Sequence, residues 1–271
     1  MQRPLRHLMR GSTVLFAAAL LATACGGDDS DTGSTTTAAA DGSSTTKAAE
    51  GATTTEKAAA EAEQKELAEA TLNASGATFP KAFYDEAIIE FKDLQPEVTI
   101  NYAGGGSGKG RTDLQEQQVD WAGSDGLVKE EDVPKYKGGA FLYFPTVAAP
   151  ITVSFNVSGV DKLQLSADTI AKIFQGEATT WDDAAIAADN PGAKLPSTPI
   201  TVARRADGSG TTENFTKFLV AAAPTTWTLK SGSTVEWPAN TQGAQGNAGV
   251  ASLIKATDGA IGYVDYSDAK A

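Results

Sequence analysis

Three turns rich in glycine and hydroxyl groups constrain the fold of this chain more than any other feature. They are GATFP (76–80), GGGSGKG (104–110) and DGSGTT (207–212), and each stands between a strand-like run and a helical pattern. Short apolar strands that alternate with helices predict an α/β sheet architecture. The start of a helix carries unpaired backbone N–H groups and favours negative charge, so three such turns suit a small tetrahedral oxyanion.

The apolar pattern predicts the elements around these turns. A short strand is expected before the turn at 76, and others at 98–102, 119–125, 199–206 and 259–266, with a long β-rich passage over 139–156. Helices are expected from Pro80, at the first helical position, through Phe91, and over 110–118, 168–190 and 211–223. The helix at 168–190 is expected to include Trp181.

Residues 1–24 have the character of a signal peptide, with basic residues before an apolar run and small residues before Cys25. Cys25 is the only cysteine of the chain, so it has no intrachain disulfide partner. The stretch is similar to the lipobox of bacterial lipoproteins, although Ala22 stands where a larger aliphatic residue is usual. We therefore predict that Cys25 is lipidated; the alternative is an ordinary secretory signal followed by an incidental cysteine. The rest of 25–70 is rich in Ala, Thr, Ser and Gly, which predicts a disordered tether.

The remaining segment, 71–271, lacks the residues that several kinds of catalyst need. His7, the only histidine, lies in the predicted signal peptide. Ser-His-Asp and Cys-His catalysis and His- or Cys-ligated zinc are therefore excluded, and we expect neither a metal nor a cofactor. The chain has a net charge of −12, and the loss of 1–24 removes three arginines and no carboxylate. This acidity argues against a nucleic-acid-binding surface.

The glycine-rich stretch 104–110 fails the pattern of a nucleotide-binding P-loop. With Lys109 as its lysine, that pattern needs glycine at 103 and a hydroxyl at 110, where the chain has Ala103 and Gly110. What remains is a turn that exposes backbone amides and the Ser107 hydroxyl before a helix. Taken alone, the stretch is better explained as a plain connection from a strand to a helix.

Two charged side chains add to the predicted oxyanion site. Arg204 and Arg205 are neighbours on a predicted strand and point to opposite faces, so one of them enters the site, and we choose Arg205. Asp125 would repel an anion unless the ligand carries a proton to donate, as hydrogen phosphate does and sulfate does not. The alternative is that Asp125 caps a helix near 129, and the residues alone leave both interpretations open.

The sequence resembles a known family, the phosphate-binding lipoproteins of the bacterial high-affinity phosphate ABC transporter. The resemblance covers 71–271 and rests on seven stretches: GATFP, NYAGGGSGKG, VDWAGSD, WDDAAIAADNPGAKLP, RRADGSGTT, GSTVEWP and GAIGYVDY. It implies a two-lobed type II periplasmic-binding-protein fold, with lobe I at 71–153 and lobe II at 154–271. In that family the chain continues past the GAIGYV strand, so we expect the end of the second lobe and the return segment of the first to be missing.

The resemblance also implies a ligand set and a function. The phosphate-binding residues would be Thr78, Phe79, Ser107, Asp125, Arg205, Ser209, Gly210 and Thr211, with Asp207 holding Arg205 in place. We expect a binding protein and not an enzyme, lipid-anchored at the extracytoplasmic face of the cell membrane, that delivers inorganic phosphate to an ABC permease and its ATPase. The alternatives are a phosphomonoester hydrolase or a binder of another oxyanion that uses the same pocket. An added role as an adhesin stays open.

Overall fold

The computed structural model describes residues 66–270 of the chain. The predicted signal peptide, Cys25 and most of the predicted tether lie outside these residues. No helix within the described range is long and apolar enough to span a bilayer.

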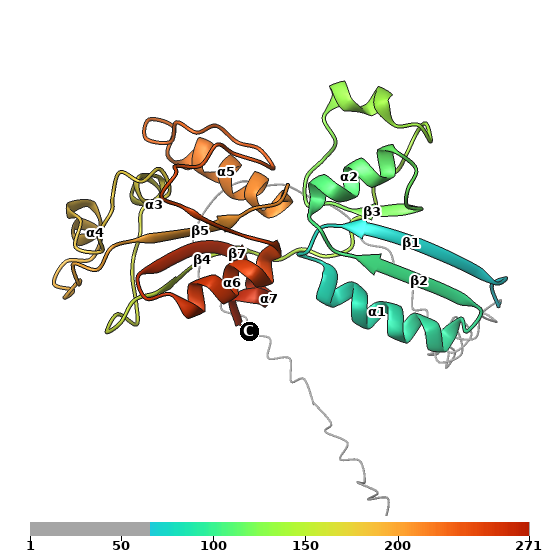
Figure 1. The fold of residues 1–271 in the computed structure, drawn as a ribbon, viewed down its shortest axis with the longest axis horizontal. Coiled ribbons are helices and arrows are strands. Elements are labelled where there is room, and N and C mark those ends of the chain that lie inside the picture. The colour runs from blue at the N-terminus through green and yellow to red at the C-terminus, as the bar shows by residue number, and fades with distance from the viewer. Residues whose placement is uncertain (1–65, 271) are drawn as a thin grey trace, which may run out of the picture. The chain divides into compact units, whose positions relative to one another are not determined.

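The first of two β-sheets is parallel and has the strand order β2-β1-β3 (Figure 1). β1 (Ala70–Gly76) pairs with β2 (Val98–Ala103) on one side and with β3 (Trp121–Gly123) on the other. The helices α1 (Lys81–Leu94) and α2 (Ser107–Gln115) lie on opposite sides of this sheet. A short 3-10 helix, η1 (Glu130–Lys135), follows β3.

The second sheet has the order β4-β7-β5-β6. β4 (Ile151–Asn156) is antiparallel to β7 (Ala260–Asp265), whereas β5 (Thr201–Arg205) runs parallel to β7 and to β6 (Gln242–Ala244). The helices of this part of the chain are α3 (Ala167–Phe174), α4 (Ala184–Asp189), α5 (Gly210–Ala222), α6 (Gly246–Ala256) and α7 (Tyr266–Lys270). Because the sheet begins at Ile151, the predicted lobe boundary between 153 and 154 falls inside β4.

The hydrophobic core centres on β7, all of whose residues are buried. Ile261 and Tyr263 pack with a large aromatic cluster, whereas Val264 packs with Val250 and Ile254 of α6. Alternate residues of a strand point to opposite faces, so β7 is covered on both sides. This double burial explains why its sequence is a nearly continuous apolar run.

The helix α1 is packed less tightly against the first sheet than the helices around β7 are packed against the second. α1 forms where the apolar spacing predicts a helix, but none of its residues is buried. Phe83, Ile89 and Leu94 are 49%, 61% and 54% exposed. The two apolar clusters of the described residues therefore belong to the second sheet.

The prediction of one helix over 168–190 is wrong. The chain leaves α3 after Phe174, and Gly176 takes a φ of +75°, which a helix interior does not allow. Trp181 is fully buried outside any helix, and its indole Nε1 donates a hydrogen bond to the Gly259 carbonyl at 3.0 Å. α4 starts only after Asp183, whose side chain accepts from the Ala185 amide at 2.9 Å and caps the helix.

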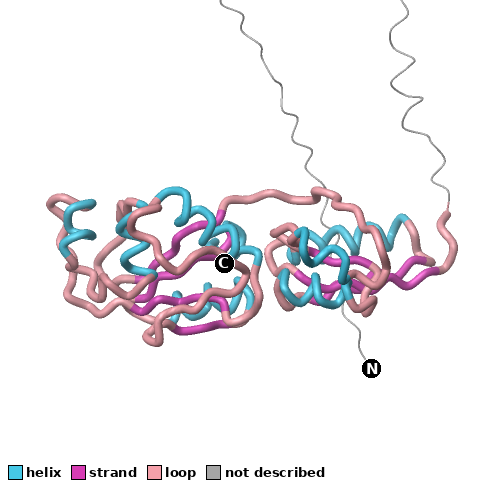
Figure 2. Tube along the Cα trace, turned by 90° about the horizontal axis from the view of Figure 1, so that it is seen from above, coloured by secondary structure: helices cyan, strands magenta, loops and turns pink. Residues whose placement is uncertain are grey.

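Two predicted boundaries also change. The β-rich passage over 139–156 contains only β4, and the chain before Ile151 is loop (Figure 2). α2 begins at Ser107, three residues before the predicted start at 110, while Pro80 caps α1 instead of occupying its first turn. The earlier start of α2 puts the Ser107 hydroxyl in the first turn of a helix, where the backbone amides lack partners within the helix and can bond groups outside it.

Candidate functional site

The N-terminal ends of α2 and α5 meet. The Gly108 amide donates to the Gly208 carbonyl at 2.8 Å, and the Gly210 amide donates to Ser107 Oγ at 3.2 Å. A Cβ on Gly210 would lie 2.6 Å from Ser107 Oγ and 2.6 Å from the Asp125 Cβ, so this approach requires glycine. The Gly106 amide also donates to the Gly76 carbonyl at 2.9 Å, so all three predicted turns meet in the folded protein.

Asp125 lies at this junction. Its backbone N–H donates to Ser107 Oγ at 3.2 Å, and its carboxylate accepts from Thr211 Oγ1 at 3.5 Å. Its carbonyl accepts from the Asn214 side-chain amide at 2.8 Å. The cap position of η1 belongs to Lys129, without a side-chain hydrogen bond, so Asp125 is not the cap of the helix near 129.

Burial raises the pKa of the Asp125 carboxyl to about 6. The positive charge of Arg205 opposes this shift, and the negative charge of Asp265 adds to it. The carboxyl is therefore mostly ionised at neutral pH and takes up a proton under mildly acidic conditions.

Arg205 and Arg204 point away from each other, as the alternation of β5 predicts. Arg205 is 3% exposed, and its guanidinium holds both carboxylate oxygens of Asp207, with Nε 2.8 Å from Oδ1. Arg204 is half-buried and donates to Thr241 Oγ1 and to the Arg205 carbonyl. Burial alone would raise the pKa of Asp207, but the hydrogen bonds and charge of Arg205 hold it below its usual range.

The remaining predicted ligand residues lie in the same region. Ser209 is fully buried, and its hydroxyl accepts from the Thr212 amide at 3.1 Å as the cap of α5, while keeping its proton to donate. Thr78 Oγ1 accepts from the Asn247 backbone amide at 3.3 Å. Phe79 is half-buried in the turn that leads into α1.

Sequence reasoning missed two polar residues at the site, Asn247 and Asp265. The side chain of Asn247 is fully buried and bonds Arg205, Thr211 and Asp265. Asp265 is the last residue of β7. Burial, together with the hydrogen bond and charge of the Asp265 carboxyl, raises the pKa of Asp268 well above its usual range. A signal was present, because QGN (245–247) is a further glycine turn before a helix, with Gly246 at a φ of +67°.

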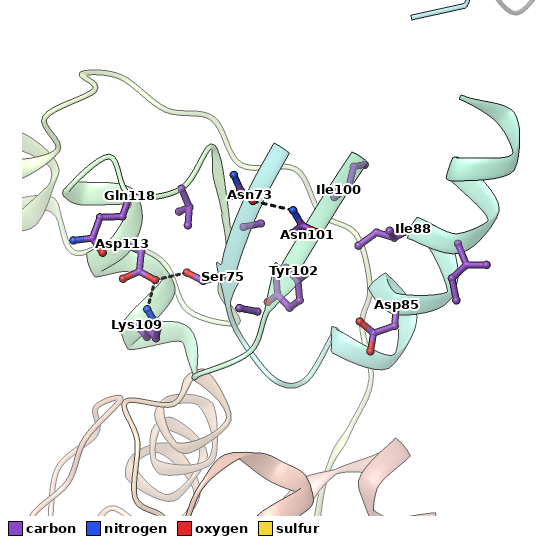
Figure 3. A pocket seen from close by; sticks show the side chains of 14 residues that line it. Asn73, Ser75, Asp85, Ile88, Ile100, Asn101, Tyr102, Lys109, Asp113 and Gln118 are labelled. Carbon is purple, nitrogen blue, oxygen red and sulfur yellow. Dashed lines mark hydrogen bonds and ion pairs between the residues drawn. The ribbon is translucent and has the colours of Figure 1, made fainter. Parts of the chain in front are cut away.

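Surface hollows also lie elsewhere on the described part of the molecule. One, of about 720 Å³, borders the edge of the first sheet and has Lys109 in its wall (Figure 3). There Asp113 accepts from Lys109 and, at 2.6 Å, from Ser75 Oγ. The lysine of the glycine-rich stretch thus pairs with its own helix, which agrees with the rejection of a P-loop. A second hollow, of about 800 Å³, has the aromatic side chains of Phe141, Tyr143 and Phe144 in its wall, the last two of them exposed. Within the described residues, no group of acidic, histidine or cysteine side chains is arranged to hold a metal.

The model of the PBP superfamily domain matches residues 30–271. The chain belongs to the PBP superfamily. Two curated PBP-type relatives are the phosphate-binding protein PstS 3 of Mycobacterium leprae, 37% identical over 204 residues, and that of Mycobacterium tuberculosis H37Rv, 35% identical over 261 residues. The matches cover 74% and 95% of this chain, and 55% and 65% of the relatives' own lengths.

Solved structures agree with the PBP assignment. A phosphate-binding protein from Stenotrophomonas maltophilia matches with a TM-score of 0.60 and 25% identity, over 73% of this chain and 60% of that one. The periplasmic phosphate-binding protein PfluDING, bound with phosphate, matches with a TM-score of 0.61 and 29% identity, over 72% of this chain and 56% of that one. The predicted α/β periplasmic-binding-protein fold is confirmed.

Proposed function

We propose that this protein is a solute-binding protein that captures inorganic phosphate outside the cytoplasm and delivers it to an ABC permease and its ATPase. The observation that carries the proposal is the meeting of the Ser107 hydroxyl, the Gly210 amide and the Asp125 carboxylate. An amide and a hydroxyl at two helix starts supply donors to an oxyanion. A carboxylate among them fits an oxyanion that brings its own proton.

The proposed ligand set is Thr78, Phe79, Ser107, Asp125, Arg205, Ser209, Gly210 and Thr211. Arg205 would supply the buried positive charge, and Asp207 would keep its guanidinium in position. The lobes at 71–153 and 154–271 would each contribute part of this set. The names of the similar proteins, which are phosphate-binding proteins, support the same ligand.

We also propose that Cys25 carries a lipid that holds the protein at the extracytoplasmic face of the membrane. Support comes from the basic, apolar and small-residue order of 1–24 and from the single cysteine that follows it. One lipid chain gives only marginal attachment, and stable anchoring takes a second chain or another signal.

Isothermal titration calorimetry of the purified chain tests the ligand. We expect saturable heat with phosphate at pH 7.5 and little with sulfate at the same ionic strength. Equal affinity for the two ions would favour a general oxyanion binder. The absence of phosphate binding would overturn the proposal. Release of phosphate from a chromogenic phosphomonoester would instead support the hydrolase.

A further inference from the structure

Asn247 connects several residues of the proposed site through its side chain and its backbone N–H. Its Oδ1 accepts from Arg205 Nη1 at 2.6 Å, and its Nδ2 donates to Asp265 Oδ2 at 2.6 Å and to Thr211 Oγ1 at 3.2 Å. Its backbone N–H donates to Thr78 Oγ1 at 3.3 Å. The side chain is fully buried, so its three bonds form away from water.

The partners fix which end of the Asn247 amide is which. Arg205 only donates hydrogen bonds, so it selects the amide oxygen. The carboxylate of Asp265 accepts from the Ser267 amide at 3.0 Å and from the Ser267 hydroxyl at 2.5 Å, so it selects the amide nitrogen. The amide is thus held in one orientation between a cation and an acid.

This orientation sets the direction of the Thr211 hydroxyl. Thr211 Oγ1 accepts from Asn247, so its own proton is directed elsewhere, and it lies 3.5 Å from Asp125 Oδ2. A bound anion would take the same proton. Asn247 therefore prepares Thr211 as a donor toward the place where the proposed ligand binds.

The neutral amide also keeps a negative charge away from Arg205. The guanidinium already holds Asp207, and a second carboxylate in contact would cancel the charge that attracts an anion. The uncharged Asn247 amide occupies the contact with Arg205, and the Asp265 carboxylate bonds the far side of that amide.

We propose that Asn247 is a positioning residue of the anion site, which aims Arg205 and Thr211 and separates Arg205 from the Asp265 carboxylate. The inference rests on the proposed function, because it assumes that the anion bound beside Arg205 is phosphate. If Asn247 had a purely structural role, the hydrogen bond between residues 247 and 265 would be enough, and it would not matter which of the two carries the charge.

The double variant Asn247→Asp/Asp265→Asn separates the two roles, because it keeps the net charge and the amide–carboxylate pair but reverses their order. The carboxylate then touches Arg205. We expect a melting temperature close to that of the wild type, and an affinity for phosphate about tenfold to a hundredfold lower, the range known for partners behind the ligands of metal sites. Asn190→Asp is the control for an Asn-to-Asp exchange away from the site, since the Asn190 side chain bonds Gln164 and Ile186 near α4. It is expected to bind like the wild type.

A second variant covers the case in which the exchange prevents folding. Asn247→Ala/Asp265→Ala removes both buried partners together, which costs less stability than removing one. It is expected to lose affinity as well, because Arg205 and Thr211 are no longer held. A wild type that binds phosphate while the folded double variants bind equally well would overturn the inference alone. A wild type that binds no phosphate would overturn the proposed function and this inference together.

Discussion

Ser107 Oγ lies 3.2 Å from the backbone nitrogen of Gly210, although 103 positions separate the two residues in the chain. Both groups stand in the first turn of a helix, and both are of the kind that binds oxyanions. In the described structure they bond each other, and the Asp125 amide shares the same oxygen. Because a neutral hydrogen bond contributes only about 1 kcal/mol net, its exchange for a charge-assisted bond to phosphate is favourable.

The first prediction concerns Gly210. Gly210→Ala puts a methyl group 2.6 Å from Ser107 Oγ and from Asp125 Cβ, so it forces the two helix starts apart. We expect a loss of stability of about 1–3 kcal/mol, together with a clear loss of phosphate affinity. Gly249→Ala, inside α6, is the control. Its new Cβ would lie at an ordinary contact distance of 3.5 Å from the Ala244 Cβ, and the variant is expected to bind phosphate normally. Thermal unfolding and calorimetry on both variants measure the difference, and equal behaviour would contradict this account of the junction.

The second prediction compares the neighbouring arginines. Arg205→Ala removes a buried charge and leaves Asp207 without its partner, so we expect a loss of about 2–5 kcal/mol in phosphate binding. Arg204→Ala removes a half-buried side chain that bonds Thr241, and it is expected to change binding far less. Calorimetry with phosphate decides, and the reverse order would mean that Arg204 faces the ligand.

One part of the site, β5 and the start of α5, could be predicted from the sequence for a local reason. Strand alternation assigned Arg204 and Arg205 to opposite faces, and the glycine- and hydroxyl-rich turns indicated where α5 begins. These features depend on residues that are close in the chain. The burial of Arg205 and the contact of Ser107 with Gly210 then agree with the predicted grouping.

The parts that could not be predicted depend on distant partners. Asn247 bonds Arg205 across 42 positions, and Trp181, which lies outside any helix, bonds the Gly259 carbonyl across 78. No local pattern encodes such pairs, because the contact exists only once the sheet has formed. Helix propensity is also a weak preference that tertiary packing overrides.

The third prediction tests the lipid anchor. If Cys25 is lipidated, the mature protein fractionates with membranes in its native host, and Cys25→Ser is released or stays unprocessed. Ser124→Ala, a substitution at an exposed residue in the folded part, serves as a control for handling and is expected to fractionate like the wild type. Immunoblots of membrane and soluble fractions provide the measurement. Membrane association that is the same with and without Cys25 would contradict the anchor.

The fourth prediction concerns selectivity. Asp125→Asn keeps the size of the side chain and removes its charge, so the like-charge penalty on sulfate disappears while the amide oxygen still accepts from phosphate. We expect the phosphate-to-sulfate ratio to fall by about tenfold or more, mainly through better sulfate binding, since an unpaired buried group costs about 1–3 kcal/mol. Competition of sulfate against bound phosphate measures the ratio. An unchanged ratio would mean that selectivity comes from other residues.

The last prediction follows from the pKa of Asp125, which burial raises from 3.8 to about 6. Between these values the folded protein holds a proton that the unfolded chain has released, so the contribution of Asp125 to stability falls as pH rises from 4 to 6 and stays low above 6. The same protonation removes the repulsion of sulfate. The phosphate-to-sulfate ratio of the wild type should therefore fall as pH drops from 7.5 to 5. Asp125→Asn is the control: it lacks the carboxyl, so its phosphate-to-sulfate ratio changes with pH only through the ionisation of phosphate. Parallel pH profiles of the two proteins would show that Asp125 does not discriminate between the anions.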